Sequence, residues 1–168
     1  PYTVTEQNFA IQVLQQRGQN PYGVFLTHAH ETINHHYERN PSDPRDAHVL
    51  TLEVDNFGNV LKQAAVGYGR RQPDSDLDAE DQAKQAQMLI TYTENRVTNT
   101  IDVADDHRTP LPCETRTYQL TGVDAPAPAG RLTFAEVLAA GTAAHLLCTP
   151  ECNEPLQCPP HMHAARLL

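Results

Sequence analysis

The chain has 168 residues, of which 39% are hydrophobic, with a mean hydropathy of −0.53 and a formal net charge of −9 at pH 7. This length suits one ordinary domain, and no apolar run reaches the roughly 20 residues that a membrane-spanning helix needs. The acidic balance repels nucleic-acid phosphates and anionic membrane surfaces, so we expect neither as a partner.

The N-terminal part, residues 1–39, predicts extended strands separated by turns. Apolar or alternating residues fill 3–5 and 9–14, and another such run begins at Gly23 and extends toward Tyr37. The loop 40–44 contains two prolines, and a residue before proline avoids the helical region. The chain starts with Pro1, without a signal peptide, which predicts a piece of a larger protein.

Residues 46–71 give the clearest structural signal in the sequence. Asp55 begins a tight turn, where its side chain accepts a hydrogen bond from the backbone two residues on, and Gly58 supplies a positive φ. The flanking run alternates, with Leu50, Leu52 and Val54 on one face and Val49, Thr51 and Glu53 on the other. This pattern predicts an antiparallel β-hairpin.

The segment after this hairpin mixes a short helix with strands. Residues 78–87 have high helix propensity, and their acidic residues come first, where they suit the helix dipole. Residues 88–97 are β-branched or aromatic at most positions and predict a strand. Residues 116–120 predict another strand, so that residues 1–123 form one β-rich region.

The remaining residues divide into a linker, a helix and a tail. Residues 124–130 are a Pro/Ala-rich linker. Residues 131–146 predict a helix, in which Thr133 and Glu136 form a capping box. Residues 147–168 are rich in Cys, Pro and His, and we expect a loosely ordered tail. The predicted fold class is therefore mainly β, with antiparallel hairpins and one or two short helices. The turn unit D-x-x-G-N-V (55–60) resembles the turn of an RHS/YD-type repeat, and this resemblance implies hairpins of an RHS-type sheet.

Histidines of the second predicted strand form the first candidate metal site. His28 and His30 share one face of a strand, as ligands do in some metal-binding β-barrels. His35 and His36 point to opposite faces, so at most one of them joins the first pair. The other interpretation is a set of polar histidines on a half-buried strand face, and we favour this second interpretation.

The tail contains a second candidate metal site with the pattern C-x3-C-x5-C-x2-H-x-H. Its members are Cys148, Cys152, Cys158, His161 and His163. Thiolates and imidazoles are suitable zinc ligands, but the spacing lacks the usual C-x2-C pair. The sequence leaves zinc binding open, and we favour free thiols.

Acidic and nucleophilic residues give no convincing catalytic site. Asp74, Asp76 and Asp78 have calcium-loop spacing but lack the glycine and the closing glutamate, so a solvated acidic loop is expected, as it is for Asp102, Asp105 and Asp106. The only serines, Ser42 and Ser75, lie outside any G-x-S-x-G motif. Cys113 lies beside Glu114, whose negative charge disfavours a thiolate. We therefore expect neither catalytic residues nor a cofactor.

Several long blocks, in consistent order, carry a family resemblance. They are HHYERNPSDPR (35–45), LTLEVDNFGNVLKQAAVGYGRR (50–71) and RTPLPCETRTYQLTGV (108–123), together with PYTVTEQNF (1–9) and LITYTENRVTN (89–99). Over residues 1–140 the chain resembles the middle region of the B component of bacterial Tc (toxin complex) insecticidal toxins, next to the RHS/YD-repeat shell. The tail departs from the family pattern from about Leu146.

The resemblance implies a secreted, structural and non-catalytic role. In this family the B component joins the C component in a hollow β-walled shell that encloses a cytotoxic segment. The shell then docks on the pore-forming A component, through which the cargo is translocated. Two alternatives stay open from the residues alone. One is a metal-binding β module with hydrolytic chemistry, and the other is a carbohydrate-binding or adhesive module of another RHS-type secreted protein.

Overall fold

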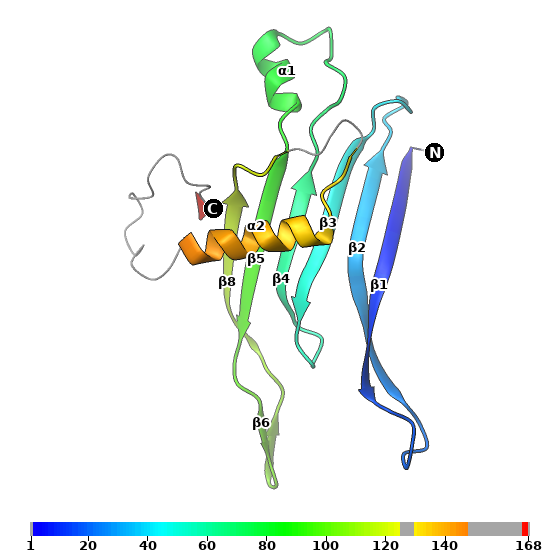
Figure 1. The fold of residues 1–168 in the computed structure, drawn as a ribbon, viewed down its shortest axis with the longest axis vertical. Coiled ribbons are helices and arrows are strands. Elements are labelled where there is room, and N and C mark those ends of the chain that lie inside the picture. The colour runs from blue at the N-terminus through cyan, green and yellow to red at the C-terminus, as the bar shows by residue number, and fades with distance from the viewer. Residues whose placement is uncertain (1, 125–129, 148–165, 168) are drawn as a thin grey trace.

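The chain folds into one antiparallel sheet with a helix lying across one face (Figure 1). The computed structural model describes residues 2–124, 130–147 and 166–167. Within these residues the main sheet has seven strands in the order β1-β2-β3-β4-β5-β8-β9, and β6 and β7 form a separate small hairpin. The strands are β1 (Thr3–Gln15), β2 (Val24–His36), β3 (Arg45–Val54), β4 (Val60–Gly67), β5 (Leu89–Val97), β6 (Ile101–Val103), β7 (Asp106–Arg108), β8 (Pro112–Leu120) and β9 (Arg166–Leu167). The prediction of a mainly β fold is confirmed.

Both predicted helices are present, and side chains cap their N-terminal ends. Helix α1 (Ala79–Gln85) begins after Asp78, whose carboxylate accepts a hydrogen bond from the backbone N–H of Asp81 at 2.9 Å. Helix α2 (Phe134–Leu147) begins with the predicted capping box. The backbone N–H of Thr133 donates to the Glu136 carboxylate at 2.7 Å, and the N–H of Glu136 donates back to the Thr133 hydroxyl at 3.3 Å.

The hairpin of β3 and β4 has the turn that the sequence predicts. Asp55 Oδ1 accepts hydrogen bonds from the backbone N–H of Phe57 at 2.9 Å and of Asn59 at 2.8 Å. Gly58 has φ +86°, a conformation that L side chains rarely adopt. Turn chemistry therefore sets the register of these two strands.

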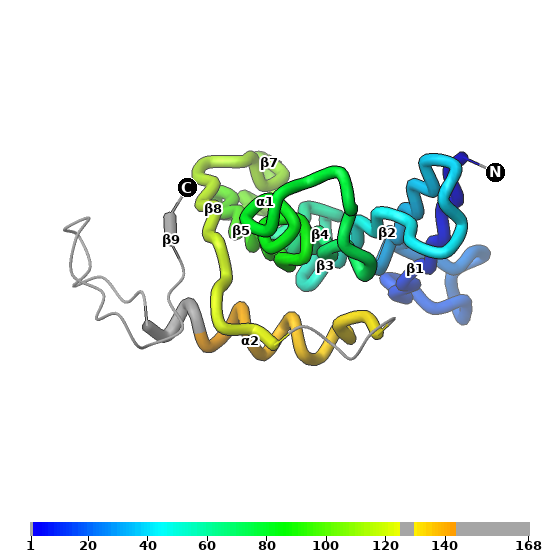
Figure 2. The backbone as a smooth tube through the Cα atoms, turned by 90° about the horizontal axis from the view of Figure 1, so that it is seen from above, coloured from blue at the N-terminus to red at the C-terminus, as the bar shows by residue number. Residues whose placement is uncertain are grey.

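The core lies between the four strands β3, β4, β5 and β8 and helix α2. Cross-strand pairing aligns the side chains of one buried row, Leu50, Ala64, Tyr92 and Tyr118. The adjacent row, Val49, Ala65, Thr91 and Gln119, lies on the opposite face. Figure 2 shows α2 beneath the sheet, where the fully buried Val137 joins the core. Only one face of the sheet is therefore dry.

The region between β5 and β8 differs from the sequence-based prediction. A short hairpin, β6–β7, occupies part of the stretch expected to be an acidic loop, and β8 begins at Pro112 rather than near Arg116. The three residues of β7 are all exposed, so this hairpin has no buried face to produce an apolar alternation. Pro112 is tolerated because it is the first residue of its strand.

Helix α2 lies close against the sheet at Gly141. A Cβ atom at this position would lie 2.4 Å from Cε2 of Tyr92, which is far inside contact distance. The absence of a side chain therefore allows α2 to rest directly on the Tyr92 ring.

Substituting Gly58 tests the turn. Gly58→Ala places a Cβ 3.5 Å from Leu26 Cδ1, an ordinary contact, so its cost comes from the positive φ alone. We expect the free energy of unfolding to fall by about 1–2 kcal/mol, measured by urea denaturation. Gly18→Ala is the control, because nothing lies within 4 Å of its Cβ. Equal stability of the two variants would contradict the assignment of a positive φ to Gly58.

Substituting Gly141 tests the close approach of α2. Although alanine favours helix more than glycine does, Gly141→Ala must displace the Tyr92 ring or the helix. We expect a loss of about 1–3 kcal/mol in the free energy of unfolding. Thr142→Ala, on the exposed side of the same helix turn, should change stability little. The smaller side chain in a Tyr92→Leu background should reduce the cost of Gly141→Ala, and a double-mutant cycle measures this coupling.

Candidate functional site: a polar anchor and a free strand edge

A polar cluster with a buried centre fixes the start of α2 to the sheet. We call it the polar anchor, and its members are His35 on β2, Asp46 and His48 on β3, Tyr68 after β4, and Arg131 before α2. His35, Asp46 and His48 are 4%, 4% and 2% exposed. The cluster joins residues from four separate parts of the chain at the point where the helix begins.

His35 is the centre of the polar anchor. Its Nδ1 lies 2.6 Å from Asp46 Oδ1, and its Nε2 lies 3.2 Å from Nη2 of Arg131. Asp46 Oδ2 also accepts a hydrogen bond from Nη2 of Arg71 at 2.8 Å. The buried carboxylate of Asp46 is thus paired with both an imidazole and a guanidinium, as burial of a charge requires.

Tyr68 and His48 form the second half of the polar anchor. The Tyr68 hydroxyl accepts a hydrogen bond from the backbone N–H of Leu132 at 3.0 Å and lies 3.1 Å from Nδ1 of His48. Burial lowers the pKa of His48 and raises that of Tyr68, so both are neutral near pH 7. His48 Nε2 has no hydrogen-bond partner among the residues that the structure describes.

The predicted histidine site is distributed over separate structural roles. His30 stacks on Phe134 of α2 with ring centroids 4.4 Å apart, and His28 Nδ1 lies 3.1 Å from the carbonyl oxygen of Ala29. His36 is exposed. Across the described ranges, no three His, Cys, Asp or Glu side chains gather in a way that could hold a metal ion.

The other candidate residues serve local structure or lie outside the described residues. Asp74 accepts a hydrogen bond from the Asp76 backbone N–H at 3.0 Å, and Asp78 caps α1. Cys113 is exposed on β8. The zinc candidates Cys148, Cys152, Cys158, His161 and His163 lie outside the described residues.

The polar anchor is not predictable from sequence motifs, although the sequence contains one signal of it. The alternation of β3 that buries Leu50 also places Asp46 and His48 on the buried face. Ionisable residues in a buried register require partners. Those partners, including Arg131, come from distant parts of the chain.

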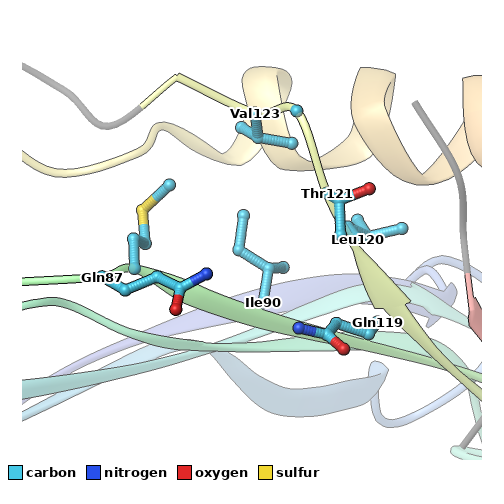
Figure 3. A pocket seen from close by; sticks show the side chains of 8 residues that line it. Gln87, Ile90, Gln119, Leu120, Thr121 and Val123 are labelled. Atoms are coloured by element: carbon cyan, nitrogen blue, oxygen red, sulfur yellow. The ribbon is translucent and has the colours of Figure 1, made fainter. Parts of the chain in front are cut away.

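A small cavity lies where β5 and β8 meet the segment that leads to α2 (Figure 3). Its volume is about 250 Å³, and Met88, Ile90, Leu120 and Val123 provide apolar lining beside polar Gln87, Gln119 and Thr121. None of its lining residues titrates near neutral pH. The cavity therefore offers neither a general acid nor a general base.

The outer strand β1 forms a free edge of the sheet. Among the described strands it pairs only with β2. Phe9, Ile11 and Val13 alternate along β1 and are 59%, 69% and 50% exposed. Phe25, which pairs with Val13 across the hairpin, is 59% exposed. We call these four residues the apolar edge patch, and α2 crosses the sheet without reaching this end of the hairpin (Figure 1).

These features define a structural class: a mainly β sheet section, covered by one helix and open at an edge. Residues 1–111 match the family model described as the insecticide toxin TcdB middle/C-terminal region, and the chain belongs to this family. Neither helix in the described part of the chain has the length and apolar character needed to cross a membrane.

Solved structures support the same assignment. The crystal structure of TcdB2–TccC3 is 31% identical over 80% of this chain, with a TM-score of 0.63. The crystal structure of TcdB2–TccC3 without the hypervariable C-terminal region gives the same identity and coverage, with a TM-score of 0.62. The present chain covers 7% of each of those chains. No curated protein matches the sequence.

The lowered pKa of His48 predicts a specific pH dependence of stability. Below the ordinary histidine pKa of 6.5, the unfolded chain binds a proton that folded His48 resists. The His48 contribution to stability therefore falls as pH drops through 6.5, until the pH lies below the folded pKa. Urea unfolding between pH 8 and 5 should show a smaller loss for His48→Gln than for the wild type. His36→Gln, at an exposed position, should retain the wild-type loss.

Proposed function

We propose that this chain is a non-catalytic wall section of a secreted Tc-type toxin B component. In this proposal it forms part of the β-shell that B and C components build around a cytotoxic cargo before translocation. The observation that carries the proposal is the free, thirteen-residue edge of β1 with its apolar edge patch. Family membership and the TcdB2–TccC3 likeness support the same assignment.

The free edge suits continuation of a sheet. An outer strand presents unpaired backbone N–H and C=O groups that another strand can satisfy. Natural proteins protect such edges with charge or proline, whereas Phe9, Ile11 and Val13 are apolar and exposed. A neighbouring strand of the same wall would pair with the backbone of β1 and cover these side chains.

The face of the sheet that α2 does not cover suits contact with water, on the inner or the outer side of the proposed shell. The row Val49, Ala65, Thr91 and Gln119 is small or polar, and the whole chain has a net charge of −9. A surface of this kind offers an unfolded cargo little apolar area and would hold it weakly. Weak binding favours release of the cargo.

The partners follow from the family. The neighbouring solved structures are TcdB2–TccC3 complexes, which supports a C component as the shell partner, and a pore-forming A component is the expected docking partner. The proposal assigns no catalytic residue and no cofactor to this section.

Charge at the edge tests the wall assignment. In the complete B component, Ile11→Lys with Val13→Lys places two ammonium groups where a neighbouring strand would pack. We expect failure of co-purification with the C component, or an enclosed segment that limited proteolysis cleaves at least about tenfold faster, because desolvating a lysine is costly.

The control for this experiment is Leu111→Lys, at a residue 52% exposed and outside the edge. It should assemble normally and protect the cargo. Normal assembly and full protection by the Ile11→Lys, Val13→Lys protein would overturn the wall assignment.

A further inference from the structure

One nitrogen of His35 lies between a donor and an acceptor that it cannot serve together. Nε2 is 3.2 Å from Nη2 of Arg131, which can only donate, and 3.2 Å from Oε1 of Glu6, which can accept. Glu6 lies on β1, and Arg131 lies just before α2. The presence or absence of a proton on this nitrogen decides which of the two is bonded.

The other ring nitrogen fixes the tautomer. Nδ1 lies 2.6 Å from a carboxylate oxygen of Asp46, and an ionised carboxylate only accepts hydrogen bonds. Nδ1 therefore carries a proton in both charge states. In the neutral ring Nε2 has a lone pair and accepts from Arg131, whereas in the charged ring Nε2–H donates to Glu6 instead.

We propose that His35 is a proton-controlled switch that exchanges the anchor of α2 for an ion pair to β1. Protonation removes the imidazole acceptor of Arg131 and places a second cation 3.2 Å from its guanidinium. Arg131 then keeps the longer ion pair of its Nη1 with Glu6 Oε2 at 4.0 Å, on the same carboxylate to which Nε2–H donates. The same proton strengthens the link between β1 and β2 through Glu6. This inference is independent of the proposed wall function.

The charges around His35 are balanced before protonation. The facing groups are Glu6 from β1, Asp46 from β3, and Arg131 from the segment before α2, while Arg71 pairs with Asp46. Two carboxylates therefore match two guanidiniums while His35 is neutral. The Tyr37 ring, 6.1 Å away, and the neutral His48–Tyr68 pair add no charge near neutral pH. Protonated His35 leaves the cluster with one excess positive charge.

Helix α2 depends on this anchor more than an amphipathic helix would. Within residues 134–143, Val137 and Gly141 are its fully buried positions, and Phe134, Leu138 and Ala140 are only partly buried against the core. At its start, Arg131 and Leu132 are held by the polar groups of His35 and Tyr68. Loss of the Arg131 contact removes one of these two hydrogen bonds and favours local opening of the helix.

Hydrogen exchange of the 168-residue chain tests the switch. Exchange of residues 131–143, corrected for the intrinsic effect of pH, is compared at pH 7.5, 6.5 and 5.5. We expect protection to fall about tenfold at pH 5.5, the low end for one hydrogen bond to a charged group. Histidine is the side chain that ordinarily changes charge in this interval.

Four variants separate His35 from other sources of pH dependence. His35→Gln keeps a neutral acceptor for Arg131 at every pH and should abolish the fall in protection at pH 5.5. His36→Gln, at an exposed position on the same strand, should retain this fall. Glu6→Gln removes the acceptor of the charged ring and should make the fall at pH 5.5 smaller, and Arg131→Gln should show low protection already at pH 7.5. An unchanged fall in His35→Gln, or its loss in His36→Gln, would overturn the proposal.

A measurement on the wild-type protein removes dependence on the folding of any variant. Nitrogen-15 NMR of the histidine ring should show His35 with a proton on Nδ1 and a bare Nε2 at pH 7.5, and with both nitrogens protonated at pH 5.5. Observation of the Nε2–H tautomer at pH 7.5 would reject the switch, as would equal protection of α2 at all three pH values.

Discussion

The contact of α2 with one face of the sheet is the constraint on which the rest of the structure depends. A single sheet has two faces, and without a second layer neither face is dry. Helix α2 supplies that layer mainly over β3, β4, β5 and β8, and the buried core side chains of the sheet come from these strands. On β2 it reaches His30, which stacks on Phe134. The approach is close because Gly141 leaves room for the Tyr92 ring. Strands β1 and β2 lie largely outside the cover and keep apolar groups exposed.

Polar contacts position this helix more sharply than its apolar surface can. The buried Val137 and the exposed Ala135 and Ala139 are all apolar, so apolar residues are not confined to one stripe that would fix its rotation. The polar anchor constrains the orientation of α2, because its hydrogen bonds have defined geometry. Buried ionic groups add little net stability but can select one arrangement over its alternatives. Here they select where α2 begins.

Local features were predictable from the sequence and distant ones were not. The Asp55–Asn59 turn and the Thr133–Glu136 capping box involve residues within four positions of each other, so their chemistry is readable along the chain. The His35–Arg131 contact joins residues 96 positions apart and depends on the folded sheet. Hairpin β6–β7 escaped prediction because neither of its strands has a buried side to create a period of two.

The covered and uncovered parts of the sheet meet at His35. On one side Arg131 leads into α2 and the dry core, and on the other Glu6 belongs to the free edge strand. A neighbour that binds and orders β1 would fix Glu6 near Nε2 and favour the charged ring. By reciprocity, protonation of His35 would favour the ordered edge. In the proposed switch, edge pairing and helix docking are coupled through this one imidazole, so that a strand paired with β1 would weaken the docking of α2 without contacting it.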